Sequence, residues 1–167
     1  MRRVVVTGLG AITPLGVGVR RTWQRLLASE SGLISVEGRG NDPVEQAQWR
    51  ELTSTVAGIV PTEPPAPPPS SLPTTGPNDD GIWRPDSWLD ASDQRRMSTF
   101  AQYAAAAAEM AMSDAGWKPT SPEEQDMTGV CLGSGIGNLH DFYATSVAYD
   151  RGVGFFLLLA FSNLGPR

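Results

Sequence analysis

The sequence predicts an α/β fold, and three observations support that prediction. Two short apolar runs, residues 2–7 and 128–132, each end in a glycine-rich loop, as buried strands of a parallel sheet often do. Between them, residues 90–115 repeat apolar side chains at three- and four-residue steps, which is typical of a helix. A strand, a helix and a parallel strand form a βαβ-type unit, whose crossover is expected to be right-handed.

The first elements are predicted at the N-terminal end of the chain. Three consecutive valines in residues 2–7 predict a strand that is buried on both faces. Thr13-Pro14-Leu15-Gly16 predicts a turn, because proline and glycine both favour a change of direction. A helix is expected from about Gly18 to Ser29. One face of it would be apolar, formed by Val19, Trp23, Leu26 and Leu27.

The middle of the chain shows a weaker pattern and a proline-rich stretch. Residues 53–57 alternate and predict a short strand. Proline lacks a backbone donor, so the proline-rich residues from 61 onward cannot join a helix or a sheet. We interpret residues 61–82 as an exposed insertion, with a docking ligand for a proline-binding domain as the alternative. Trp83 and Trp88 are expected to pin the chain back onto the body.

Residues 90–115 give the strongest helix signal. Asp90, Ser92 and Asp93 supply capping oxygens and negative charge at its start. The alanine run 104–108 has little side chain, so a neighbouring segment is expected to approach its backbone closely. Gly116 is expected to end the helix.

Composition bounds the class of protein. The 167 residues suit one domain, and the net charge of −5 argues against nucleic acid as a partner. The longest apolar run, residues 153–161, reaches about half of the ~20 residues that a membrane span requires. One cysteine permits no intrachain disulfide, and one cysteine with one histidine predicts no metal site. We therefore expect an intracellular protein without a metal.

The first glycine loop, residues 7–13, allows two interpretations. A strand, a tight turn and a helix could hold the pyrophosphate of a dinucleotide, as in a nucleotide-binding oxidoreductase. However, Thr13 and Pro14 stand where the third glycine and the helix start should be, and no acidic residue follows at the expected distance. We therefore predict close backbone packing at Gly8 and Gly10, and no cofactor. For the second loop, residues 133–137, close approach to a ligand remains open.

Cys131 and His140 are the two residues that could suggest covalent catalysis. Cys131 lies within the apolar run, away from a helix start that would stabilise its thiolate, so we predict a buried apolar side chain. His140 is expected to be a solvated residue of a loop or helix start rather than a base. We therefore assign no catalytic residue in this chain.

Several segments together resemble the β-ketoacyl-acyl-carrier-protein synthases of the chain-elongating kind. The resemblance runs from about Arg2 to Arg151, less than half of a complete synthase. The matching segments are residues 2–16, 23–27, 31–34, 93–97 with Phe100 and Tyr103, 114–117, and 128–137.

The resemblance implies a thiolase-like fold of two similar βαβαβαββ halves in five layers, usually a homodimer. This chain would hold part of it, the first βαβ-type half in truncated form. Family members attach an acyl group to a cysteine thiolate, and malonyl-carrier-protein then loses carbon dioxide and attacks it. The family's catalytic cysteine, two histidines and lysine have no counterpart here, so the chain is expected to be inactive alone. Ile136 matches a position that borders the acyl-chain pocket.

The resemblance also implies a domain organisation. Residues 1–152 form the N-terminal part of the synthase domain, with the insertion at 61–82, and residues 153–167 form an apolar tail unlike the family. A frameshift, a retained intron and a truncated gene model are all consistent with that tail. The family implies acyl-carrier protein and a homodimer mate as partners, and location in the cytoplasm if bacterial or the mitochondrion if eukaryotic. Three hypotheses remain: an inactive synthase fragment of fatty acid biosynthesis, a nucleotide-binding oxidoreductase, and a non-catalytic module that pairs with a full-length synthase.

Overall fold

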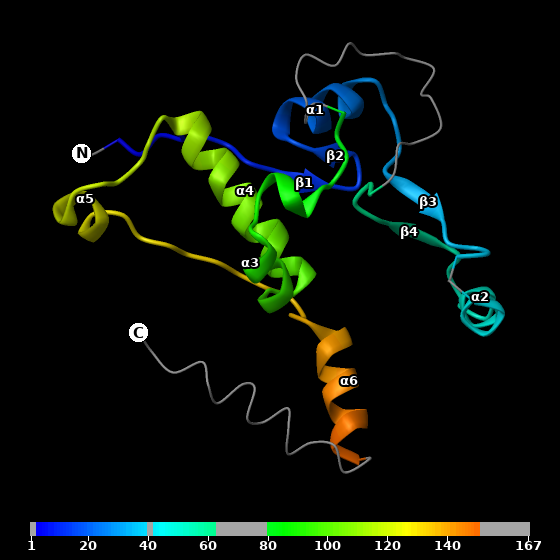
Figure 1. Ribbon diagram of the computed structural model, residues 1–167. Coiled ribbons are helices and arrows are strands. Elements are labelled where there is room, and N and C mark those ends of the chain that lie inside the picture. Colours follow the sequence, from blue (N-terminus) through cyan, green and yellow to red (C-terminus); the bar gives the residue numbers. More distant parts are fainter. Residues whose placement is uncertain (1–2, 40–41, 63–79, 151–167) are drawn as a thin grey trace.

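The computed structural model describes residues 3–39, 42–62 and 80–150, with short strands and helices in the N-terminal part and helices alone after β4 (Figure 1). The predicted α/β class is therefore confirmed as a mixed helix-and-strand structure. Residues 63–79 of the predicted insertion (61–82) and the whole tail (153–167) lie outside the described residues, whereas Ile82, at the end of the insertion, is buried rather than exposed. The elements are β1 (Ile12–Thr13), β2 (Gly16–Val17), α1 (Val19–Leu27), β3 (Leu33–Ser35), α2 (Pro43–Arg50), β4 (Val56–Gly58), the 3-10 turn η1 (Pro85–Ser87), α3 (Ala91–Arg96), α4 (Thr99–Ala115), α5 (Pro122–Asp126) and α6 (Leu139–Asp150).

The strands of the described part form two antiparallel pairs. β1 pairs with β2, with Ile12 opposite Val17, and β3 pairs with β4, with Ile34 opposite Ala57. The strand predicted at residues 53–57 is observed as β4, which begins and ends later in the chain, at Val56–Gly58. The predicted parallel βαβ unit and its right-handed crossover do not occur among the described residues.

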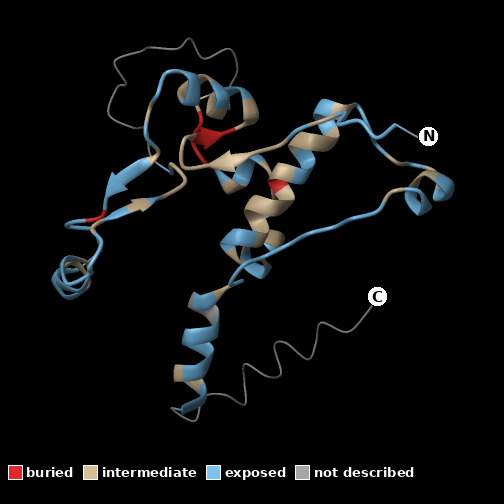
Figure 2. Cartoon of the chain, turned by 180° about the vertical axis from the view of Figure 1, so that it is seen from behind, coloured by how far each residue is buried: buried red, intermediate tan, exposed pale blue. Residues whose placement is uncertain are grey.

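The core is small and gathers around one tryptophan. Trp83 is buried and meets Tyr103 edge to face, with ring centroids 4.9 Å apart. Val17 and Ala106 are buried beside it, and the half-buried Trp88 packs against the same cluster. Both tryptophans therefore hold the chain on the body as predicted. Figure 2 shows how few residues are buried elsewhere.

Both predicted buried strands are wrong in this structure. Residues 3–9 run without strand pairing, and Val4 and Val6 are 94% and 79% exposed. Residues 128–132 likewise form no strand, and Val130 is 91% exposed. A strand buries its two faces only against neighbouring segments, and none of the described residues supplies such a neighbour.

The helix predicted at 90–115 is two helices. Asp90 caps α3 through the backbone N–H groups of Ser92 and Asp93, as predicted. Met97 then adopts an extended conformation (φ −94°, ψ 135°), which ends α3 and starts a new helix. The Gln102 side-chain amide bridges the break by donating to the carbonyls of Gln94 and Met97.

The helix ends follow local chemistry. α4 ends at Gly116, which adopts the predicted left-handed conformation (φ 61°). α1 occupies most of its predicted range, but Trp23, Leu26 and Leu27 remain 52–67% exposed. α5, which was not predicted, begins with a reciprocal capping box between Ser121 and Glu124.

No helix among the described residues is both long and apolar enough to span a membrane.

Candidate functional site

The first glycine loop lies directly on the backbone of α4. A Cβ atom placed on Gly8 would be 2.1 Å from the Ala111 carbonyl oxygen, and one on Gly10 would be 1.9 Å from the Ala107 carbonyl oxygen. Such an approach requires glycine on one side and small side chains on the other. The two predictions, close packing at the glycines and close approach to the alanine run, therefore meet in one contact.

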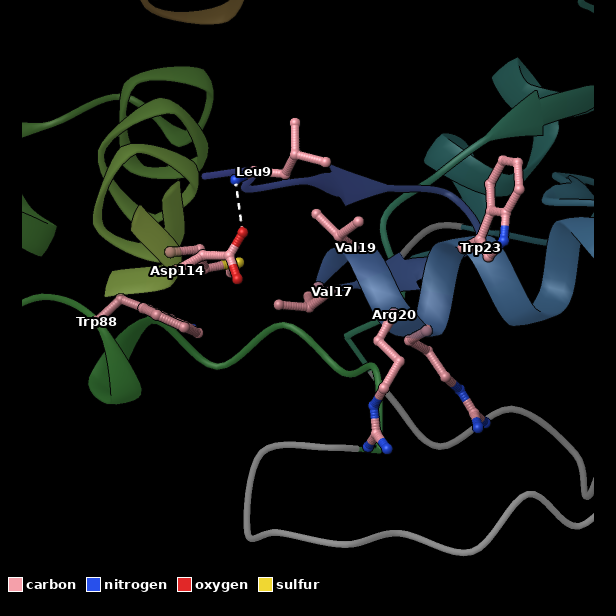
Figure 3. Close-up of a pocket in the computed structure, with 10 residues that line it drawn as sticks. Leu9, Val17, Val19, Arg20, Trp23, Trp88 and Asp114 are labelled. Atoms are coloured by element: carbon pink, nitrogen blue, oxygen red, sulfur yellow. Dashed lines mark hydrogen bonds between the residues drawn. The ribbon is translucent and has the colours of Figure 1, made fainter. Parts of the chain in front are cut away.

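A hydrogen bond fixes this contact. The Leu9 N–H, which lies between the two glycines, donates to the Asp114 carboxylate at 2.9 Å (Figure 3). A nucleotide-binding loop must keep such N–H groups for phosphate oxygens. Here one of these donors is taken by a carboxylate, whose charge would also repel a phosphate. The geometry thus disfavours the nucleotide-binding oxidoreductase.

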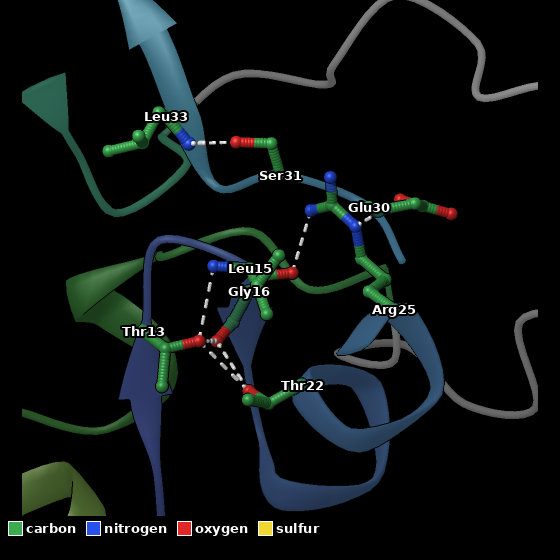
Figure 4. Close-up of polar contacts among 8 residues, drawn as sticks. All are labelled: Thr13, Leu15, Gly16, Thr22, Arg25, Glu30, Ser31 and Leu33. Carbon is green, nitrogen blue, oxygen red and sulfur yellow. Dashed lines mark hydrogen bonds and ion pairs between the residues drawn. The ribbon is translucent and has the colours of Figure 1, made fainter. Parts of the chain in front are cut away.

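A polar network holds the turn that follows the loop (Figure 4). The Thr13 hydroxyl accepts the Leu15 N–H at 3.1 Å and lies 3.0 Å from the Thr22 hydroxyl. Arg25, on the same helix as Thr22, donates to the Leu15 carbonyl at 2.7 Å. Two residues of α1, Thr22 and Arg25, thereby hold the predicted turn through Thr13 and Leu15.

A cleft of about 480 Å³ is lined by residues of the glycine loop, α1 and α4. Leu9, Val17, Trp23 and Trp88 contribute apolar walls, and Asp114 lies within it (Figure 3). Arg20 also lines the cleft, but its side chain extends away from Asp114. The arrangement brings no nucleophile next to a base, so it supports no covalent chemistry.

The second glycine loop is open. The Ser134 hydroxyl accepts the Gly137 N–H at 3.0 Å, and Gly137 has a φ of 75°. A Cβ atom on Gly133, Gly135 or Gly137 would meet nothing within 4 Å. The loop therefore leaves backbone exposed where a ligand could approach.

Ile136 projects from this loop and is 81% exposed. α6 follows immediately, and its side chains Leu139, Phe142 and Tyr143 are also exposed. With Ser146, they line a shallow apolar depression of about 560 Å³. Ile136 thus stands at the start of an uncovered apolar surface.

Cys131 and His140, the two residues considered for catalysis, lie in segments of different local structure. Cys131 is exposed, so the prediction of a buried side chain is wrong, because the segment around it is not a strand. His140 lies in the first turn of α6, which agrees with a helix-start residue. Across residues 3–39, 42–62 and 80–150, no group of three histidine, cysteine, aspartate or glutamate side chains could hold a metal ion.

Asp80 and Tyr103 are two of the ionisable groups outside the glycine loops whose pKa is shifted. The Arg84 guanidinium, 2.6 Å from the Asp80 carboxylate, lowers the pKa of Asp80. Burial raises the pKa of Tyr103 in the core. Neither group lies beside a nucleophile, so we attribute both pKa shifts to an ion pair and to burial in the fold rather than to a catalytic role.

The described residues therefore define a mixed helix-and-strand scaffold that presents a glycine-rich loop and an exposed apolar surface. A family model described as the beta-ketoacyl synthase N-terminal domain matches residues 1–158. The chain belongs to the β-ketoacyl synthase family, whose N-terminal domain has a thiolase-like fold.

Named relatives agree with this family. The chain is 38% identical to "3-oxoacyl-[acyl-carrier-protein] synthase 2" of Rhizobium meliloti, over 83% of this chain and 28% of the relative. It is 38% identical to the mitochondrial 3-oxoacyl-[acyl-carrier-protein] synthase of Arabidopsis thaliana, over 84% of this chain and 28% of the relative. A Saccharomyces cerevisiae homolog is 31% identical over 90% of this chain and 33% of the relative. The chain spans between a quarter and a third of the length of these relatives.

Proposed function

We propose that this chain is the N-terminal portion of a 3-oxoacyl-acyl-carrier-protein synthase of fatty acid biosynthesis. The match of residues 1–158 to the synthase N-terminal domain is the observation that supports it most strongly. The whole enzyme would extend an acyl thioester by two carbons through decarboxylation of malonyl-carrier-protein. Its partners would be acyl-carrier protein and a homodimer mate, not nucleic acid. Its location would be intracellular, the cytoplasm in a bacterium or the mitochondrion in a eukaryote.

Within that enzyme, this chain would supply scaffold and part of the acyl pocket. Gly8 and Gly10 would seat the N-terminal segment on α4, a role supported by the close contacts to Ala107 and Ala111. Ile136 would border the alkyl chain, because an exposed apolar side chain on an open loop suits an alkyl ligand. The covalent step needs a cysteine thiolate with oxyanion donors, and we assign that role to none of the residues that the structure describes.

The proposed boundaries follow from the sequence. Residues 1–152 would be a truncated first half of the thiolase-like fold, with a proline-rich insertion at about 61–82. Residues 153–167 would be an apolar tail, of which residues 159–167 lie outside the domain match. A synthase fragment that is inactive alone accounts for this organisation.

A chimera tests this proposal. Residues 1–152 would replace the matching segment of the Rhizobium meliloti relative, and elongation of acyl-carrier-protein substrates would be followed by mass spectrometry. We expect condensation in the chimera, and a shorter accepted acyl chain when Ile136→Phe narrows the pocket. Met127→Phe, at an 86% exposed position, is the matched control and should leave chain length unchanged. A folded chimera that does not condense, or equal chain lengths in both variants, would contradict the assignment.

A second candidate is a non-catalytic module that pairs with a full-length synthase. The exposed apolar side chains Val4, Val130 and Phe142 favour a chain that needs a covering partner. Co-purification with a full-length synthase from the same source would support the module. If no synthase co-purifies, the synthase fragment is the hypothesis that stands.

A further inference from the structure

We propose that a second cleft, away from both glycine loops, binds a small oxyanion such as phosphate. The cleft has a volume of about 210 Å³, and each water molecule of the liquid occupies about 30 Å³. It therefore has room for a tetrahedral anion with a few waters. Two arginines line it, Arg25 in α1 and Arg39 in the turn after β3.

Arg25 is held in place before any ligand arrives. Its side chain is only 16% exposed, its Nη1 group donates to the Leu15 carbonyl at 2.7 Å, and its Nε group donates to Glu30 at 2.6 Å (Figure 4). Among the described residues, no hydrogen bond uses its Nη2 group. A fixed guanidinium with unused N–H groups loses little side-chain entropy when it binds an anion.

Arg39 reaches the cleft from a separately anchored turn. The Arg39 N–H donates to the Val36 carbonyl at 3.1 Å, and Val36 is itself 1% exposed and bonded to the Thr55 carbonyl. The planar guanidinium groups of two arginines on one cleft have the geometry to donate paired hydrogen bonds to the oxygens of a phosphate or carboxylate.

Hydroxyl groups complete the polar lining. Ser31 accepts the Leu33 N–H at 3.1 Å, so the hydrogen of its hydroxyl can still be donated. Thr62 also lines the cleft, next to Pro61, whose carbonyl accepts the Trp83 N–H at 2.7 Å. Arg25, Arg39 and the Glu30 carboxylate together carry a net charge of +1. The charge and the donors favour an oxyanion over a cation or a neutral ligand.

The test is equilibrium dialysis of the whole chain against labelled inorganic phosphate, at an ionic strength held constant with sodium chloride. We expect one saturable site per chain with a dissociation constant of about 1 mM or tighter, competed by sulfate and not by equivalent chloride. Arg39→Gln should weaken binding about tenfold, which is the loss of one hydrogen bond to a charged group. Arg39→Lys, which keeps the charge but not the fork, should fall between Arg39→Gln and the unmodified chain.

Arg96→Gln is the matched control, because it removes the same charge from an exposed residue that does not line the cleft. It should bind phosphate as the unmodified chain does. The absence of saturable binding, equal weakening in both variants, or competition by chloride as effective as by sulfate would overturn the proposal. If Arg39→Gln does not fold, the sulfate and chloride competition on the unmodified chain still decides it.

Discussion

The contact between Gly10 and α4 predicts a large loss of stability for Gly10→Ala. The added Cβ atom would lie 1.9 Å from the Ala107 carbonyl oxygen, where ordinary contact begins at 3.4 Å. The clashing atom belongs to the backbone of a helix, so no side-chain rotation can relieve it. The loop must therefore move away from α4 by about 1.5 Å, the difference between those two distances.

Two terms set the size of the effect. Overpacking of this kind costs about 1–3 kcal/mol. The shift also strains the hydrogen bond from the Leu9 N–H to Asp114, which at an exposed position contributes about 1 kcal/mol. We expect the free energy of unfolding to fall by about 2–4 kcal/mol, a large part of the 5–15 kcal/mol typical of a domain.

Urea unfolding followed by tryptophan fluorescence measures this, since Trp83 lies in the core. With a urea dependence of about 2 kcal/mol per molar, the midpoint should drop by about 1–2 M. Gly129→Ala is the control, because its Cβ atom would meet nothing within 4 Å and the unfolded state changes equally in both variants. Equal midpoints for the two variants would refute the close contact with α4.

Three further predictions concern the core, the cysteine and activity. Burial raises the pKa of Tyr103 above its ordinary 10.0, so stability is complete below that pH and is lost as the pH rises toward the folded-state pKa. Tyr103→Phe should remove this alkaline loss in fluorescence-monitored unfolding, and an unchanged alkaline limb would contradict it. Cys131 is exposed, so its thiol should react with Ellman's reagent as fast without denaturant as with it, and a slower reaction of the native chain would mean that the segment is covered. The purified chain should release no labelled carbon dioxide from malonyl-carrier-protein above a buffer control, because none of the described residues forms a nucleophile and oxyanion pair.

Local features were predictable because their chemistry lies within a few residues. The turn at Thr13–Gly16, the capping of α3 by Asp90 and the end of α4 at Gly116 each depend on backbone and side-chain groups that are close in sequence. The synthase family could also be predicted, since its matching segments occur in order along the chain. A helix completes its hydrogen bonds within itself, so the sequence pattern is enough to indicate it.

The tertiary structure decided what depends on distant neighbours. Val4–Val6 and residues 128–132 have a strand-like sequence but stay exposed, because strand pairing and burial need partners that no local pattern supplies. The break at Met97 is stabilised by the Gln102 side chain from the next helix. The cleft lined by Arg25 and Arg39 likewise joins two elements, and the distance between these residues in the sequence does not predict that they share a cleft. The sequence by itself determined the helical regions around α1 and α4, the turn at Thr13–Gly16 and the family. Which glycines touch α4, and which charges face one another, depended on contacts between segments far apart in the chain.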